Sequence, residues 1–278
     1  MSTRLGVLGW PVAHSRSPAM QNAALRAAGL DGWHYQRLPV PPQLLGELVR
    51  ALAGSGFAGA NVTIPHKQAA LALSDEASEA ARQIGAANTL TFGRDGFIAA
   101  ENTDAPGLIA ALASSPRGQR AMVLGAGGSA RAAVWALREA GAAEVMVWNR
   151  TGARAESLAA DLGARAVASP QPAELLVNCT SVGLTEAGEL ERSATGGDAL
   201  NQLGLTFDAL DEYSYVVDMV YRSRSKTPLL AAAEARGLPA LDGLDVLVAQ
   251  GALSFELWTG QPAPLEAMRA AVRGDEDS

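Results

Sequence analysis

Ala121-Met122-Val123-Leu124-Gly125-Ala126-Gly127-Gly128-Ser129-Ala130 is the stretch that decides the fold of this chain. Its first four residues are apolar and run directly into glycine, which predicts a short buried strand followed by a turn. A helical pattern begins at once, with apolar residues at positions 130, 133, 134 and 137 and Gly141 as the stop. Strand, glycine turn and helix in this order are typical of the unit that binds a dinucleotide.

Gly125, Gly127 and Ala130 have the spacing G-x-G-x-x-A, a permitted form of the dinucleotide fingerprint. Gly125 would allow the tight turn, Gly127 would let the backbone approach a pyrophosphate, and Ala130 would let helix and strand pack closely. The N–H groups of the helix that starts near Ser129 would hold the phosphate charge. An ordinary strand-to-helix turn in a glycine-rich chain is the alternative interpretation of this motif alone.

The next predicted strand, 144–148, ends in Asn149-Arg150-Thr151, close to where such a site reads the ribose. An NAD site needs an acid there to accept hydrogen bonds from both ribose hydroxyls, and none is present. Arg150 and Arg154 instead offer planar, permanently charged donors that suit a 2′-phosphate. The sequence therefore favours NADP over NAD, with a solvated surface position as the alternative for Arg154.

The composition describes a compact soluble protein of 278 residues, 48% hydrophobic and 18% charged. A chain of this length has room for one large domain or two modest ones with ample core. Its net charge of −7 argues against broad binding to nucleic acid or to anionic membranes. The histidines, at positions 14, 34 and 66, show no metal-ligand spacing, and no metal is expected.

The cytoplasm is the expected location. The N-terminus lacks a basic stretch followed by an apolar run, so no signal peptide is expected. No uncharged apolar stretch of about 18 residues is present that could span a bilayer. The single Cys179 excludes an internal disulfide and suggests a reducing compartment.

Strand and helix patterns alternate from the start of the chain, which predicts an α/β architecture with largely parallel sheets. In the first part we predict strands at 5–8, 33–40 and 60–64, a hairpin of 88–92 and 97–100, and helices at 18–29, 43–53 and 105–113 with two more between 66 and 84. Later we predict strands at 164–167, 175–178 and 216–221, helices at 153–162 and 229–235, and mainly helix from 244 onward. The segment 185–208 is expected to be a loop, and 114–118 a domain boundary.

Polar side chains stand at several predicted strand ends in the first 105 residues. Ligands of open α/β sheets bind beyond the carboxyl ends of the strands, so these side chains are candidates for a binding site. The candidates are Ser15, Ser17, Asn61, Thr63, Lys67, Asn88 and Asp104. Their hydroxyl, amide, ammonium and carboxylate groups suit a small, hydroxyl-rich acid.

Each candidate also has an ordinary structural explanation. Ser17 and Asp104 are favoured residue types at helix N-caps, and Lys67 could be a solvated surface lysine. Thr63 is at home in a strand and Asn88 in a turn. These alternatives stay open for each residue taken singly.

Eight blocks, in order over nearly the whole chain, resemble the signature blocks of the shikimate dehydrogenase family. The first four are His14-Ser15-Arg16-Ser17-Pro18, Asn61-Val62-Thr63-Ile64-Pro65-His66-Lys67, Gly85-Ala86-Ala87-Asn88-Thr89-Leu90 and Asn102-Thr103-Asp104. The others are Gly125-Ala126-Gly127-Gly128-Ser129-Ala130-Arg131, Asn149-Arg150-Thr151, Asn178-Cys179-Thr180-Ser181-Val182-Gly183 and Leu247-Val248-Ala249-Gln250-Gly251-Ala252. The joint match is highly specific, although no single block is.

This resemblance implies the reversible, NADPH-dependent reduction of 3-dehydroshikimate to shikimate. It implies an N-terminal α/β substrate domain, a Rossmann-type doubly wound NADP-binding domain, and C-terminal helices that return to the first domain. Residues 1–113 and 241–278 would form the substrate domain, and 114–240 the NADP domain. Substrate contacts are implied at Ser15, Ser17, Thr63, Asn88, Asp104, Tyr221 and Gln250. Coenzyme contacts are implied at Gly125, Ala126, Gly127, Gly128, Ser129, Asn149, Arg150, Thr151, Arg154, Met219 and Gly243.

Charge placement assigns the acid–base chemistry to Lys67. As hydride reaches the carbonyl carbon, the oxygen becomes an alkoxide and needs a proton. Lys67 is the only cationic side chain of the polar set that can donate one near neutral pH, because arginine does not give up its proton. Asp104 would orient that ammonium and a substrate hydroxyl, so Lys67 and Asp104 are the predicted catalytic pair.

Two departures from the family pattern and three other functions bear on this interpretation. The segment 221–228 is a residue longer than the family's usual loop and lacks its internal proline, and 185–208 is a long insert.

An NAD-dependent quinate/shikimate dehydrogenase is disfavoured by Arg150, and a nucleotide-sensing protein without turnover by the retained Lys67–Asp104 pair. A folate-linked dehydrogenase is disfavoured by the Ser15/Ser17 loop. A monomer or homodimer is expected.

Overall fold

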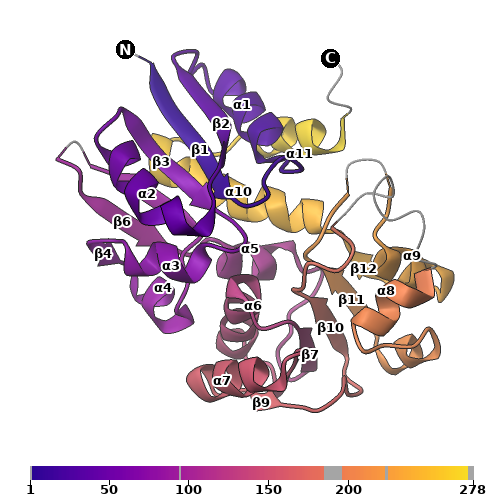
Figure 1. Cartoon of the computed structure of the whole chain (residues 1–278). Helices are drawn as coiled ribbons and strands as arrows, with labels where there is room; N and C mark the ends of the chain where they lie inside the picture. The colour runs from indigo at the N-terminus through magenta and orange to yellow at the C-terminus, as the bar shows by residue number, and fades with distance from the viewer. Residues whose placement is uncertain (1, 94, 185–195, 223–224, 275–278) are drawn as a thin grey trace. The chain divides into compact units, whose positions relative to one another are not determined.

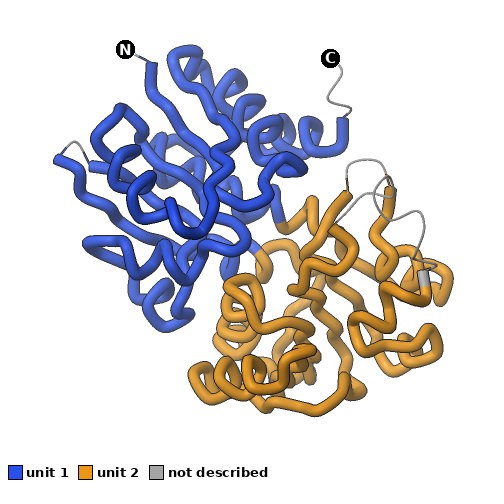
Figure 2. Tube along the Cα trace, viewed as in Figure 1, with its two compact units in different colours: residues 1–107, 247–278 blue, residues 108–246 orange. Residues whose placement is uncertain are grey.

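The computed structural model of this chain describes residues 2–93, 95–184, 196–222 and 225–274. The chain forms two compact units: unit 1 comprises Met1–Gly107 and Leu247–Ser278, and unit 2 comprises Leu108–Val246 (Figure 2). Each unit is built around a six-stranded sheet. No helix in the described ranges has both the length and the apolar character needed to cross a membrane.

The sheet of unit 1 has the strand order β2-β1-β3-β5-β6-β4 (Figure 1). Its strands are β1 (Thr3–Gly9), β2 (Trp33–Pro39), β3 (Phe57–Val62), β4 (Glu76–Ala77), β5 (Thr89–Phe92) and β6 (Ile98–Glu101). β1 pairs in parallel with β2 and β3, whereas β5 is antiparallel to both β3 and β6. The predicted hairpin is therefore present, and β3 and β6 end at the same edge of the sheet.

Most helices of unit 1 follow a strand, whereas α11 follows α10. They are α1 (Ser17–Ala27), α2 (Leu45–Ala53) after a short 3-10 helix η1 (Pro42–Leu44), α3 (Lys67–Ala72), α4 (Glu79–Ile84), α5 (Asp104–Ala111), α10 (Gly243–Thr259) and α11 (Leu265–Arg273). The prediction that Ser17 is the N-cap of α1 is wrong. Arg16 holds that position with a helical backbone conformation, so Ser17 is already the first helical residue and caps nothing.

The C-terminal helices return to unit 1, as expected. α11 packs on α1 and buries Met268 and Val272. α10 reaches the sheet through Trp258, whose indole N–H donates to the Leu90 carbonyl at 3.0 Å. A Cβ at Gly59 of β3 would lie only 2.1 Å from Trp258 Nε1, so glycine is required there to admit the indole.

The sheet of unit 2 has the order β12-β11-β10-β7-β8-β9, and every strand is parallel to its neighbours. Its strands are β7 (Arg120–Leu124), β8 (Glu144–Trp148), β9 (Arg165–Ala166), β10 (Leu175–Asn178), β11 (Tyr215–Asp218) and β12 (Ala240–Leu241). Counted from β9 to β12 this is the doubly wound order 3-2-1-4-5-6, in which the strand order reverses between β7 and β10. The predicted Rossmann-type fold is confirmed.

Both faces of β7 are buried, which explains its four consecutive apolar residues. Ala121 and Val123 belong to a core with α6 (Gly128–Glu139) and α7 (Gly152–Leu162). Met122 and Leu124 belong to a second core with α8 (Gly196–Gln202) and α9 (Pro228–Ala235). The two cores follow from the alternation of side chains along a strand.

The predicted loop 185–208 is wrong where the structure describes it, because α8 occupies part of it; 185–195 lie outside the described residues. Leu200, Leu203 and Leu205 are buried in the second core and stabilise this segment. A 3-10 helix, η2 (Asp208–Glu212), follows. The predicted strand 216–221 ends early, at Asp218, whose carboxylate accepts the Val220 N–H and so turns the chain out of the sheet.

The chain passes between the two units inside helices. α5 continues across the boundary at 107/108, and α10 across the boundary at 246/247. The sequence predicts boundaries at 113/114 and 240/241, six residues from those of the compact units. Domain boundaries are usually recognised by loops rich in polar residues and glycine. A boundary inside a continuous helix has no such change in composition, so the sequence does not mark it.

Candidate active site

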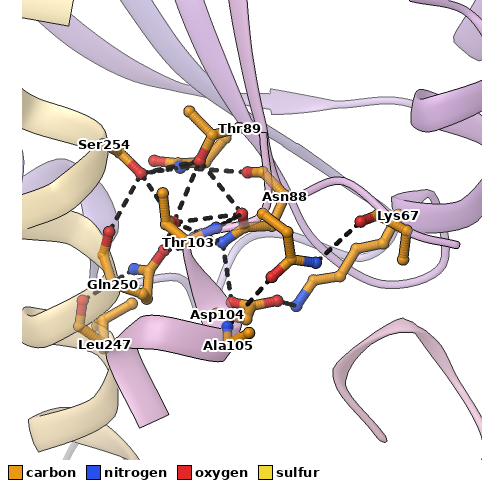
Figure 3. A network of polar contacts seen from close by, with 12 residues as sticks. Lys67, Asn88, Thr89, Thr103, Asp104, Ala105, Leu247, Gln250 and Ser254 are labelled. Carbon is orange, nitrogen blue, oxygen red and sulfur yellow. Dashed lines mark hydrogen bonds and ion pairs between the residues drawn. The ribbon is translucent and has the colours of Figure 1, made fainter. Parts of the chain in front are cut away.

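Lys67 and Asp104 form a buried ion pair at the carboxyl edge of the unit 1 sheet (Figure 3). Lys67 is the first residue of α3 and Asp104 the first residue of α5. The distance from Nζ to Oδ2 is 2.6 Å, and the two residues are 9% and 6% exposed. They meet because each begins a helix shortly after β3 or β6, and both strands end at this edge.

The surroundings exclude the ordinary explanations for this pair. Asn102, not Asp104, caps α5, because its Oδ1 accepts the Ala105 N–H at 3.1 Å. Asp104 therefore keeps both carboxylate oxygens for other partners. Lys67 is buried, so it is not a solvated surface lysine. Buried charges of this kind require a partner, and each residue is the partner of the other.

Asn88 holds the second oxygen of Asp104. The backbone N–H of Thr103 donates to Asn88 Oδ1 at 2.7 Å, and because an N–H can only donate, this contact assigns the amide orientation. The amide nitrogen Nδ2 then donates to Asp104 Oδ1 at 2.8 Å. Asn88 thus orients the carboxylate so that its Oδ2 faces Lys67 (Figure 3).

Gln250 of α10 joins the same hydrogen-bonded group. Asn88 Nδ2 donates to Gln250 Oε1 at 3.1 Å, and Gln250 Nε2 donates to the Leu247 carbonyl at 2.8 Å. Gly107 of α5 permits this approach, since a Cβ there would lie 2.7 Å from the Cβ of Gln250. The structure therefore brings together four predicted site residues: Lys67, Asn88, Asp104 and Gln250.

A layer of buried hydroxyl and amide groups lies behind Asn88. Asn88 Nδ2 donates to Thr103 Oγ1 at 2.9 Å, and that oxygen lies 3.2 Å from Ser254 Oγ. Asn61 donates to Ser254 Oγ at 2.9 Å and accepts from the Tyr35 hydroxyl at 2.7 Å. Satisfied buried networks of this kind hold their members rigidly. Sequence reasoning found Asn61 but missed Ser254. The feature that could have identified Ser254 is a hydroxyl side chain within an otherwise mainly apolar helix.

Ser15, Ser17 and Thr63 lie beyond the ends of β1 and β3, which are neighbours in the sheet. Ser15 Oγ accepts the Ser17 N–H at 3.3 Å, and the Ser15 carbonyl accepts from the Arg37 guanidinium at 2.8 Å. Thr63 donates its N–H to the Leu8 carbonyl at 2.8 Å.

Gly125 and Gly127 occupy the turn between β7 and α6 in unit 2. Gly125 has a φ of +110°, and a Cβ there would lie 3.1 Å from the Cys179 backbone, so this turn requires glycine. A Cβ at Gly127 would meet no heavy atom within 4 Å, so the space beside this backbone is open. Gly127 is also the N-cap of α6 and supplies no side-chain cap. An open helix N-terminus of this kind fits a pyrophosphate.

The residues expected to read the ribose follow β8. Asn149 Nδ2 donates to the Thr151 carbonyl at 2.9 Å, and the Arg154 N–H donates to the same oxygen at 3.0 Å. Arg150 and Arg154 are exposed, and neither forms an ion pair with a carboxylate among the described residues. The Gly125 N–H donates to the carbonyl at the end of β8 at 2.8 Å, which joins the two segments. This donor set fits a 2′-phosphate.

Met219, Tyr221 and Gly243 also belong to unit 2. The Met219 N–H donates to the Asn178 carbonyl at 2.9 Å, which holds Met219 beside the end of β10. A Cβ at Gly243 would lie 2.8 Å from the Met219 carbonyl oxygen, so glycine lets α10 start against this segment. Tyr221 follows β11 and is in a different unit from the other predicted substrate residues.

Asp218 is a buried acid that sequence reasoning did not single out. It ends β11 and is 0% exposed. Burial raises the pKa of its carboxyl to about 7, against hydrogen bonds from Thr227, Val220 and Asn178 that favour the charged form. The feature that could have identified Asp218 is its position as an acidic residue inside the predicted strand 216–221. Among the described residues, no three His, Cys, Asp or Glu side chains are grouped to hold a metal ion.

Three family models match the chain in order. Residues 7–90 match the model described as shikimate dehydrogenase substrate binding domain. Residues 108–179 match shikimate / quinate 5-dehydrogenase, and residues 243–273 match shikimate 5′-dehydrogenase C-terminal domain. The first lies in unit 1, and the second in unit 2.

Individual proteins resemble the chain over nearly its whole length. A Paracoccus denitrificans protein named shikimate dehydrogenase (NADP(+)) is 43% identical, covering 96% of this chain and 94% of its own. The crystal structure of shikimate 5-dehydrogenase from Thermus thermophilus in complex with NADP(H) and shikimate is 42% identical, with a TM-score of 0.83 and coverage of 98% and 99%. Ligand-free 5-ketofructose reductase of a Gluconobacter strain is 32% identical, with a TM-score of 0.80 and coverage of 98% of each chain.

Proposed function

This chain belongs to the shikimate dehydrogenase family, and on that premise we propose that it reduces 3-dehydroshikimate to shikimate with NADPH, reversibly. The observation that carries the proposal is the buried Lys67–Asp104 ion pair, 2.6 Å apart, in the unit that contains the match to a substrate-binding domain. Two exposed arginines after β8, Arg150 and Arg154, support NADP as the coenzyme.

The substrate is a ring acid with several hydroxyl groups, and the chain offers matching partners. Its hydroxyl and carboxylate groups would bind Ser15, Ser17, Thr63, Asn88, Asp104 and Gln250, with a further hydroxyl from Tyr221. Most of these side chains are buried. A site with buried polar groups rejects an analogue that lacks a matching hydroxyl, because the group on the protein is then left unpaired.

NADP(H) would bind along the carboxyl edge of the unit 2 sheet. The coenzyme contacts that we propose are Gly125, Ala126, Gly127, Gly128, Ser129, Asn149, Arg150, Thr151, Arg154, Met219 and Gly243. The open backbone at Gly127 and the uncapped start of α6 support the pyrophosphate position. When bound, NADPH supplies the hydride that reduces the ketone carbon.

Lys67 would supply the proton. As the carbonyl oxygen of 3-dehydroshikimate becomes an alkoxide, Lys67 Nζ donates a proton to it, and the product hydroxyl forms. The lysine is left as a neutral amine that regains its proton from solvent. In the direction of shikimate oxidation, the same amine accepts the hydroxyl proton. Asp104 stays a carboxylate and keeps Nζ in place through the 2.6 Å contact.

A steady-state assay tests the proposal directly. The purified chain is mixed with shikimate or quinate and with NADP+ or NAD+, and the growth of the reduced nicotinamide band is followed. We expect the fastest turnover with shikimate and NADP+. A preference for quinate with NAD+ would instead identify the NAD-dependent alternative, and no turnover with any pair would identify a binding protein.

A third substrate belongs in the same assay. The likeness to 5-ketofructose reductase, at 32% identity over 98% of this chain, favours a test of 5-ketofructose with NADPH. Both ketones are hydroxyl-rich, but only 3-dehydroshikimate carries a carboxylate. Reduction of 5-ketofructose that is faster than reduction of 3-dehydroshikimate would contradict the proposed substrate.

We also propose that the protein works in the cytoplasm as a monomer or homodimer. The only cysteine, Cys179, is buried and has no second cysteine in the chain with which to form a disulfide, which agrees with a reducing compartment. Light scattering on the eluted protein measures the assembly, and a tetramer or larger species would contradict it.

A further inference from the structure

Asp218 is the last residue of β11 and lies at the carboxyl edge of the unit 2 sheet. It is fully buried. A buried acid is costly unless hydrogen bonds compensate its charge. The proposed hydride and proton transfers do not use this carboxylate, so another role has to explain its contacts.

Three donors surround the Asp218 carboxylate. Oδ1 accepts from Asn178 Nδ2 at 2.9 Å and from the Val220 N–H at 3.1 Å. Oδ2 accepts from the Thr227 hydroxyl. The Asn178 orientation is assigned, because its Oδ1 accepts the Thr180 N–H at 3.0 Å and that group can only donate. One carboxylate thus connects the end of β10 with Val220, just after β11, and with Thr227, just before α9.

The same contacts fix the backbone of Met219. Its N–H donates to the Asn178 carbonyl at 2.9 Å, and its neighbour Val220 donates to Asp218. The backbone at the start of α10 also lies close to this segment. A Cβ at Gly243 would lie 2.8 to 2.9 Å from the carbonyl oxygens of residues 218–220, which leaves no slack. Met219 is therefore clamped between β10 and the start of α10.

The strand order predicts which half of a dinucleotide would bind beside the loops after β10 and β11. A dinucleotide lies across the point where strand order reverses, here between β7 and β10. Arg150 and Arg154 follow β8, on one side of that point, so the 2′-phosphorylated adenosine half belongs there. The loops after β10 and β11 are on the other side, where the nicotinamide half belongs.

We propose that Asp218 is a positioning residue for the nicotinamide half of NADP(H): its buried carboxylate holds the Met219 backbone in place against the end of β10. This inference rests on the proposed function for the identity of the coenzyme. Asp218 does not touch the coenzyme itself, and it acts through Asn178, Val220 and Thr227.

Calorimetric binding tests the proposal without any turnover. Asp218→Asn keeps the size of the side chain but removes its charge and one acceptor oxygen. At a pH above 7, where the Asp218 carboxyl is ionised, we expect the affinity for NADP+ to fall about tenfold, as loss of one charge-assisted hydrogen bond should. The affinity for adenosine 2′,5′-bisphosphate, which lacks nicotinamide, should stay within about twofold, because no adenosine contact has moved.

The matched control is Glu174→Gln. Glu174 is also a carboxylate of unit 2, but it pairs with Arg120 at the surface, at 2.9 Å, where β7 and β10 begin. Its loss should leave both affinities unchanged. If Asp218→Asn weakens both ligands equally, or weakens neither in a folded protein, the positioning role is refuted.

A second pair of variants covers the case in which Asp218→Asn does not fold. Thr227→Val removes the hydroxyl donor, and Thr227→Ser keeps it. The valine variant should lose affinity for NADP+ but not for adenosine 2′,5′-bisphosphate, and the serine variant should keep the wild-type affinity for both. Equal affinities in the two variants would also overturn the proposal.

The two proposals fail in different ways. A wild-type protein that binds NADP+ but does not reduce 3-dehydroshikimate contradicts the proposed reaction and leaves the positioning test intact. A wild-type protein that binds no NADP+ overturns both.

Discussion

Asn88 illustrates how a single residue can orient a charged pair. The sequence implies a substrate contact for it, and the structure shows its amide already engaged with Thr103, Asp104 and Gln250. Its Nδ2 has two hydrogens and three acceptors within 3.1 Å. Any contact between Asn88 and substrate therefore has to share these bonds, and the structure supports orientation of Asp104 as its first task.

Also at the residue scale, Lys67 is the proposed proton donor. Lys67→Ala should lower kcat for 3-dehydroshikimate by about 100-fold or more, the usual effect of losing a positioned acid, with a modest change in KM. Lys67→Arg is the control, since it keeps a positive charge beside Asp104 but does not release a proton near neutral pH. An arginine variant with wild-type kcat would remove Lys67 from the proton transfer.

Arg150 carries the prediction on coenzyme choice. Arg150→Ala should weaken NADP+ binding by about tenfold or more and leave NAD+ binding nearly unchanged, because only NADP+ has the 2′-phosphate. Arg154→Ala, one turn further along the exposed start of α7, shows whether the second guanidinium shares the task. Equal losses for the two coenzymes in the Arg150 variant would mean that this side chain reads some other group.

At the element scale, the strand–turn–helix unit of β7 and α6 separates a folding requirement from a binding requirement. The two glycines of the turn look alike in sequence. In the structure, Gly125 has a left-handed backbone and close neighbours, whereas Gly127 has neither. The positive φ of Gly125 and its close contact with the Cys179 backbone together make the first glycine a structural necessity.

A pair of alanine variants tests that distinction. Gly125→Ala should destabilise the protein by about 1–3 kcal/mol, because alanine at φ +110° is strained and its Cβ crowds Cys179. Gly127→Ala should leave the free energy of unfolding within about 0.5 kcal/mol but weaken NADP+ binding, because its Cβ enters the open space proposed for the pyrophosphate. Urea denaturation and calorimetry measure the two effects. Equal destabilisation by both variants would contradict this account.

At the scale of the whole molecule, stability depends on how buried acids titrate. Burial raises the pKa of Asp218 to about 7, from 3.8 in an unfolded chain. Between these two pH values the folded state keeps the Asp218 proton and the unfolded state releases it, so this group's contribution to stability decreases as pH rises. Glu174 acts in the opposite sense, because hydrogen bonds from Arg120 lower its pKa to about 2.

The corresponding prediction compares two unfolding series. The difference in unfolding free energy between wild type and Asp218→Asn should shift in favour of the variant as pH rises from about 4 to 7, by at most about 1.4 kcal/mol per pH unit. Above pH 7 the difference should level off. A difference that is flat over this range would show that Asp218 does not titrate there. Urea denaturation at each pH provides the free energies.

Short-range pattern in the sequence determined the α/β class, the hairpin and the glycine turn, because alternation, turn residues and capping signals act over a few positions. The return of the C-terminal helices was instead implied by the resemblance to the shikimate dehydrogenase family. Polar residues at predicted strand ends, together with the need for a proton donor, singled out Lys67 and Asp104. The roles of these two residues remain predictions. The prediction of a loop over 185–208 was wrong for its second half. The leucines of 200–205 lie in a polar, glycine-rich segment, so only their packing in the folded core shows that they are buried.

Only the tertiary structure decided which polar residues meet. Asn102 caps α5 in place of Asp104, Thr103 sets the orientation of Asn88, and Asp218 joins two loops that are about 40 residues apart in sequence. These contacts depend on which strand ends lie side by side. The physical reason is that a hydrogen bond needs atoms within about 3 Å, and sequence spacing does not specify distances between strands that pair far along the chain.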